Sequence, residues 1–192
     1  MKGFFKQYSY NIVKNLVNQF AISLFGAMLS MVTTASGNSV FAISVSVFAI
    51  CFYLFLVYTT TWEIGAKDRI SVDVGKKPYR PHTGLIISLV SNIPSFIIAI
   101  MYFITGLFPA GAKVAGSMNF LSGIFSMLFQ GMYTGFLMNV KVSDTAYLVN
   151  MWWAYFLIII PALAVSWLAY FAGFKNFRMI APLFDKKNQN KK

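Results

Sequence analysis

Apolar residues run along this chain in long blocks that contain no charge. Four blocks lack Asp, Glu, Lys and Arg altogether: 15–62, 83–112, 114–140 and 145–174. A helix of a water-soluble protein carries a polar face in every turn. A bilayer span instead needs roughly 20 apolar residues to cross about 30 Å of hydrocarbon. The pattern therefore predicts an all-α, polytopic membrane helix bundle.

Four segments meet this length requirement: 12–32, 40–62, 85–107 and 146–174. The first two are separated by 33–39, a stretch of Thr, Ala, Ser, Gly and Asn that favours a turn. We therefore expect a helical hairpin at the N-terminus. All four spans belong to one transmembrane domain that covers the whole chain.

The N-terminal segment has a second interpretation. Apolar residues recur at helical spacing from Phe4 to Ile12, which predicts a helix that begins at the membrane surface. The alternative is a cleaved signal peptide, with Thr33 and Ala35 as small residues at the cleavage site. Because a long segment with three lysines precedes the most apolar part, we favour an uncleaved span.

The basic residues predict the orientation of the spans. The loop 63–82 holds five of them, and with those of the N-terminus and the C-terminal tail they make fourteen of the sixteen Lys and Arg. Basic segments stay on the cytoplasmic side, so this loop and both termini are expected there. Lys113 and Lys141 would lie on the outer side, in the segment made up of residues 108–145.

The Gly-rich block 116–139 decides this topology, because a crossing there would place the basic tail outside. Small and polar residues follow one helical face of the block. We expect a re-entrant or interfacial element, with a fifth span or a helix packed on the bundle as alternatives. The expected helix-packing face consists of Ser122, Ser126, Gly131 and Gly135, the last two forming a GxxxG pair.

The net charge of +11 raises the question of nucleic-acid binding. A nucleic-acid-binding protein gathers its bases on a folded polar surface, whereas here they lie between and beyond the apolar blocks. We therefore expect no nucleic-acid partner, and instead a bilayer with anionic headgroups.

Residues suited to catalysis are scarce. The chain has one His, one Cys and five acids, and none of these acids falls within an expected span. His82 has no second ligand nearby in the sequence, and Cys51 has no partner for a disulfide. We expect no enzyme activity, no cofactor and no metal site.

The third expected span contains the strongest polar signal within the membrane. Ser91 and Asn92 adjoin Pro94, which removes a helix hydrogen bond and can bend the helix. A small polar pocket is expected from residues of this span and the Gly-rich block: Ser91, Asn92, Asn119, Gln130 and Thr134. The alternative is that Asn92 only joins helices and Pro94 only bends one.

A candidate docking element follows the second span, where Glu63 and Lys67 are spaced to continue the helix beyond the membrane. Its expected contact residues are Trp62, Glu63, Lys67, Asp68 and Arg69. The run WEIGAKDR, with Gly84 and Leu85 after it, resembles a pattern in uncharacterised small multi-pass membrane proteins of Gram-positive bacteria. This resemblance implies no activity.

The function expected from these features is that of a noncatalytic subunit or accessory partner of a larger membrane complex, such as a transporter, in the cell membrane. The alternative is a small transporter, channel or solute-binding subunit that uses the polar pocket around Asn92.

Overall fold

The computed structural model describes residues 2–108, 113–144 and 146–177, and their side chains except at 2, 3 and 113–115. Some of the basic residues that predict the orientation of the spans lie outside the described residues or side chains. They are Lys2, Lys113 and those from Arg178 to Lys192. The described residues are 83% helical. This agrees with the expected all-α class.

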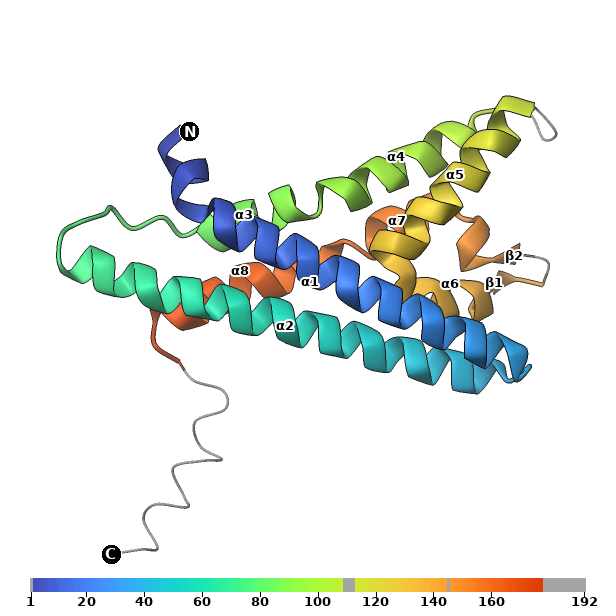
Figure 1. Ribbon diagram of the computed structural model, residues 1–192, viewed down its shortest axis with the longest axis horizontal. Helices are drawn as coiled ribbons and strands as arrows, with labels where there is room; N and C mark the ends of the chain where they lie inside the picture. Colours follow the sequence, from blue (N-terminus) through green and yellow to red (C-terminus); the bar gives the residue numbers. More distant parts are fainter. Residues whose placement is uncertain (1, 109–112, 145, 178–192) are drawn as a thin grey trace, which may run out of the picture.

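The two longest helices form the expected N-terminal hairpin. Helices α1 (Lys2–Ala35) and α2 (Ser39–Asp73) lie side by side and antiparallel (Figure 1). Their connection turns at Gly37, whose φ of 67° suits glycine, and the Asn38 side chain caps α2 by accepting from the Phe41 amide. At 34 and 35 residues, each helix is about 50 Å long, more than the hydrocarbon thickness. Each therefore has a part that extends beyond the membrane.

The third expected span, 85–107, is bent. Helices α3 (Thr83–Ser91) and α4 (Ile93–Gly106) meet at an angle of 57° with only Asn92 between them. Pro94 has no amide hydrogen for a continuing helix, and the Asn92 side chain donates to the Ser88 carbonyl at 2.9 Å. The bend directs α4 away from the α1–α2 hairpin (Figure 1).

The Gly-rich block returns toward the bundle. Helix α5 (Lys113–Gln130) runs antiparallel to α4 and leads through the 3₁₀ turn η1 (Gly131–Tyr133) into the short helix α6 (Thr134–Asn139). Together, 116–139 are long and apolar enough to cross a membrane. The expected re-entrant path stays a prediction.

The last expected span, 146–174, begins with non-helical structure. Strands β1 (Lys141–Ser143) and β2 (Ala146–Tyr147) form a small antiparallel sheet, and the 3₁₀ turn η2 (Leu148–Asn150) follows. Helices α7 (Trp152–Leu157) and α8 (Ile160–Phe174) complete the segment and form one apolar unit. This β-hairpin was not predicted, because its strands of three and two residues are too short to show an alternating pattern.

Four helical segments of the described chain are long and apolar enough to cross a membrane, and the bent α3–α4 pair would make a fifth. The number four agrees with the sequence-based expectation, but the set differs, because 116–139 takes the place of the bent third span.

The start of α1, the end of α2, residues 74–82 and the end of α8 lie together (Figure 1). We call this the basic end.

Candidate functional site

The continuation of α2 beyond the expected span builds the most polar site in the described part of the molecule. Helix α2 continues to Asp73, so the expected loop 63–82 is shortened to 74–82. We call Glu63–Asp73 the α2 extension. Its buried residues Ile64 and Asp68 continue the buried stripe of α2 that starts at Ala42 and runs through Tyr53, Val57 and Thr61. The same face of α2 thus packs against the bundle inside and beyond the membrane.

Glycines let the helices approach closely at the basic end. A Cβ built on Gly65 would overlap the Tyr170 carbonyl of α8, and one on Gly173 would overlap the Trp62 carbonyl of α2. Gly84, at the start of α3, faces the Ser166 carbonyl and the Tyr170 side chain in the same way. Three helices therefore meet here with almost no side chain between their backbones.

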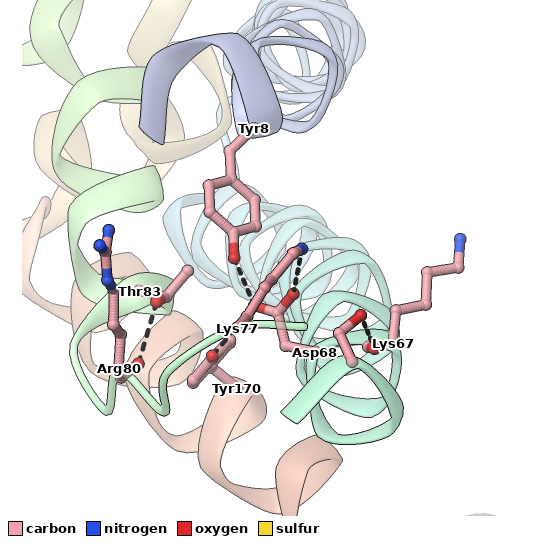
Figure 2. A network of polar contacts seen from close by, with 8 residues as sticks. Tyr8, Lys67, Asp68, Lys77, Arg80, Thr83 and Tyr170 are labelled. Carbon is pink, nitrogen blue, oxygen red and sulfur yellow. Dashed lines mark hydrogen bonds and ion pairs between the residues drawn. The ribbon is translucent and has the colours of Figure 1, made fainter. Parts of the chain in front are cut away.

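The Asp68 carboxylate lies at the centre of this junction and is 6% exposed. Its Oδ2 accepts from the Tyr8 hydroxyl of α1 at 2.5 Å and from the Tyr170 hydroxyl of α8 at 3.0 Å. The Lys77 Nζ forms an ion pair with Oδ1 at 3.4 Å. Figure 2 shows the two tyrosines reaching the carboxylate from different helices, with Lys77 above it. One carboxylate thus joins α1, α2, α8 and the 74–82 loop.

A cleft of about 280 Å³ opens beside this network, and we call it the Asp68 cleft. Its walls come from α1, the α2 extension, the loop, the start of α3 and α8; they are formed by Phe4, Gln7, Tyr8, Asp68, Val72, Lys77, Pro78, Arg80, Thr83 and Tyr170. Arg80 stands across the cleft, with its guanidinium directed away from Asp68 (Figure 2). The arrangement offers charged hydrogen-bond donors beside a partly apolar wall, which is the chemistry of a binding site.

The other expected docking residues lie elsewhere on the extension. Glu63 and Lys67 form an exposed ion pair at 2.6 Å, and Arg69 pairs with Asp73 at 3.6 Å. The Trp62 indole donates to the Phe177 carbonyl at 2.8 Å, which ties α2 to the chain after α8. Of the five expected residues, only Asp68 belongs to the buried network.

Tyr8 and Tyr170 are site residues that the sequence reasoning missed. Tyr8 is part of an apolar stripe and Tyr170 lies in an uncharged block, so both resemble core aromatics in sequence. Their hydroxyls are the only sign of a polar role. A buried tyrosine needs a hydrogen-bond partner, but here the partner, Asp68, lies 60 and 102 residues away in the sequence.

A second polar group lies in the middle of the bundle. The Gln19 amide of α1 donates to Ser95 Oγ at 2.6 Å and to the Phe129 carbonyl at 3.1 Å. The Gln130 amide donates to the Ser95 carbonyl at 3.3 Å, and Ser126 donates to Gln130 Oε1 at 3.3 Å. We call these four residues, Gln19, Ser95, Ser126 and Gln130, the amide cluster; it joins α1, α4 and α5.

The polar pocket expected around Asn92 is assembled in part. Asn92 and Gln130 line one cavity with Gln19, Tyr53, Ser95 and Tyr133, but its volume is about 10 Å³. Ser91 is buried and donates to the Ser88 carbonyl of its own helix. Asn119 is exposed on α5, and Thr134 is half-buried on α6. The cavity has room for roughly one water molecule and not for a larger solute.

The expected helix-packing face is used within the chain. Ser122 is fully buried and Ser126 is 9% exposed, on the side of α5 that faces the bundle. A Cβ on Gly131 would overlap the Ser23 carbonyl of α1, and one on Gly135 would approach Ser46 and Ala42 of α2. These residues let η1 and α6 lie directly against the hairpin.

No protein-family model, curated protein or solved structure matches this chain. The resemblance of 62–69 to membrane proteins of Gram-positive bacteria therefore stays a prediction. Within the described residues no three His, Cys, Asp or Glu side chains gather as metal ligands would.

Proposed function

We propose that this chain is a noncatalytic subunit of a larger membrane assembly, with its basic end in the cytoplasm. The α2 extension would be the part that docks to the partner. The four apolar segments support the membrane location. The Lys and Arg residues of the segments that make up the basic end support the orientation.

The docking proposal is based on the exposed side of the α2 extension. The α2 extension is fixed from its inner side by Gly65 and Asp68, while its opposite side is exposed in the described chain. That side presents an exposed stripe, which consists of Glu63, Lys67, Ile70 and Val74. Ile70 and Val74 are both 65% exposed, although they lie beyond the expected end of the hydrocarbon.

The chemistry of the exposed stripe indicates the kind of partner. Apolar side chains flanked by charges of both signs suit an amphipathic helix that carries complementary charges. We therefore propose a cytoplasmic helix of another membrane subunit as the partner. The GxxxG pair no longer supports an intermolecular contact, since Gly131 and Gly135 pack within the chain.

The test is to purify the tagged full-length chain from its native membranes in mild detergent and to identify stoichiometric copurifying chains. Ile70→Glu is expected to remove the partner, because it places a charge in the apolar part of the stripe. Lys76→Glu changes a charge in the neighbouring loop and serves as the control. A wild-type chain that purifies without any partner would overturn the proposal.

A charge swap separates docking from helix stability. Glu63→Lys combined with Lys67→Glu keeps an ion pair at the same i, i+4 spacing but reverses the charges that a partner meets. We expect the single changes and the swap to weaken copurification alike. Full recovery of the partner in the swap would mean that the pair only stabilises the helix.

The alternative of a transport or solute-binding subunit based on Asn92 receives less support. Its cavity of about 10 Å³ is too small for a solute.

A further inference from the structure

We infer that the Asp68 cleft binds a phosphate-bearing anion at the membrane surface. The inference concerns the inner side of the α2 extension and does not depend on the docking proposal. It rests on the charges around the cleft, the shape of its walls and its depth relative to the membrane.

The cleft has more positive than negative charge. Its lining includes Asp68, Lys77 and Arg80. The carboxylate is already matched by Lys77 and two tyrosine hydroxyls, so it presents little free acceptor capacity. Among the described residues no carboxylate forms an ion pair with Arg80. Arg80 is therefore a surplus cation at the rim.

A neighbouring hollow adds to this surplus. It has a volume of about 430 Å³, shares Gln7, Tyr8, Asp68 and Lys77 with the Asp68 cleft, and reaches Lys14, Glu63 and Lys67. Glu63 and Lys67 neutralise each other. Within the described side chains of the two hollows, four cations face two carboxylates. A ligand with negative charge is thus favoured over a cation.

The donors suit phosphate in particular. The guanidinium of Arg80 can present two parallel N–H groups to two oxygens of one phosphate. Lys77 has further ammonium hydrogens beyond the one directed at Asp68. Phe4 and Pro78 supply an apolar surface for the remainder of an amphipathic ligand. Asp68 acts as a positioning residue that holds Lys77 and Tyr8 at the wall.

The depth of the cleft favours a lipid as the source of this phosphate. Tyr8 lies four residues before Ile12, the expected start of the hydrocarbon span, which is about 6 Å along a helix. Asp68 lies six residues after Trp62, about 9 Å along α2. Lipid headgroups occupy this zone beside the hydrocarbon.

The test uses the full-length protein in nanodiscs of phosphatidylcholine with a minority of phosphatidylglycerol. Native mass spectrometry then counts phosphatidylglycerol molecules that stay bound after release into mild detergent. Arg80→Gln and Lys77→Gln are expected to lower the affinity for retained phosphatidylglycerol about tenfold, because each removes charge-assisted hydrogen bonds. Lys76→Gln, in the same loop but outside the lining, is expected to leave it unchanged.

A second arm distinguishes the source of the anion. Calorimetric titration of inorganic phosphate into protein in neutral nanodiscs would detect a soluble ligand. Binding that requires Arg80 in either arm supports the inference, and the arm in which it occurs identifies a lipid or a free phosphate compound. The inference would be overturned if neither arm showed binding that depends on Arg80, or if Lys76→Gln lowered the affinity as much as Arg80→Gln. Size-exclusion profiles of all variants verify that each is folded.

Discussion

The amide cluster in the middle of the bundle and the Asp68 cleft at its basic end each join residues from several helices, but they use different chemistry. The amide cluster contains neutral groups, in which Gln19 and Gln130 meet at Ser95. The cleft contains the carboxylate of Asp68 and the ammonium of Lys77. An ionised group is costly in hydrocarbon, while a neutral amide can be satisfied by one or two helix partners. The depth of each site in the membrane thus accounts for its charge.

The two sites also differ in the space they enclose. The amide cluster borders a cavity of about 10 Å³, whereas the Asp68 cleft holds about 280 Å³ and opens at the surface. Buried polar groups that hydrogen-bond to one another across helices fix the positions of those helices. Surplus donors beside an open cleft can also bind something else. The comparison therefore agrees with the proposal that the middle serves packing and the basic end serves binding.

The largest effect is expected from breaking the helix junction that supports the cleft. Gly65→Leu would drive a side chain into the backbone of α8 at Tyr170, and backbone cannot move aside as a side chain can. We expect a loss of at least about 3 kcal/mol in the free energy of unfolding. Equilibrium unfolding of the full-length chain in mixed micelles measures it.

Gly116→Leu is the matched control for this change. A Cβ at Gly116 meets no described atom within 4 Å, so a larger side chain there has space. If both variants unfold alike, the close approach of α2 and α8 is not what holds the basic end.

A smaller effect is expected from removing the charge at the centre of the cleft. Asp68→Ala leaves Tyr8, Tyr170 and Lys77 without their shared acceptor. We expect about 2 kcal/mol of destabilisation in the same unfolding measurement. Asp68→Asn keeps an oxygen acceptor and should cost about half as much. An unchanged stability in Asp68→Ala would show that the carboxylate does not join these helices.

Removing a polar side chain of the amide cluster, in the middle of the bundle, should lower the free energy of unfolding by less. Gln19→Leu removes two hydrogen bonds, to Ser95 and to the Phe129 carbonyl. Hydrogen bonds between membrane helices contribute about 0.6 kcal/mol each, so we expect a loss of about 1 kcal/mol. Asn119→Leu, at an exposed position on α5, is the control. If Gln19→Leu lowered the free energy of unfolding as much as Asp68→Ala does, the two sites would not differ in their contribution to stability.

The long uncharged blocks were sufficient to predict the helical class, because span length and apolarity are properties of contiguous residues. The α1–α2 hairpin and the extension of α2 through Lys67 follow from such local signals. The bend at Asn92 agrees with the signal of Pro94, but its angle depends on how α4 packs. The 3₁₀ turn at Gly131–Tyr133 gave no distinct signal within its apolar block.

The contacts of the site depend on pairing between distant segments, which a single sequence does not contain. Asp68 was singled out with its charged neighbours, but nothing local distinguishes it as the buried one among them. Its burial follows from the buried stripe on α2 that starts at Ala42, far along the helix from Asp68. The partners Tyr8 and Tyr170 come from the two ends of the chain. Similarly, Gly131 and Gly135 indicate a close approach without naming the approaching helix.

The smallest effect on stability is expected from removing a tyrosine hydroxyl that has no hydrogen-bond partner. The same change, Tyr to Phe, can be made at both sites and so compares them directly. Tyr133 is 5% exposed at the middle cavity, and its hydroxyl makes no hydrogen bond within the described chain. Tyr133→Phe should therefore change stability by less than about 0.5 kcal/mol, since no hydrogen bond is lost. Tyr8→Phe, which removes a hydrogen bond to the Asp68 carboxylate, should cost about 1.5 kcal/mol.

Unfolding of the two phenylalanine variants side by side measures this contrast. A cost of about 1 kcal/mol or more in Tyr133→Phe would mean that the hydroxyl has a partner, and the cavity has room for one water that would also reach the unpaired Gln19 Oε1. The middle of the bundle would then be a hydrated polar site like the basic end, and the division between packing and binding would have to be abandoned.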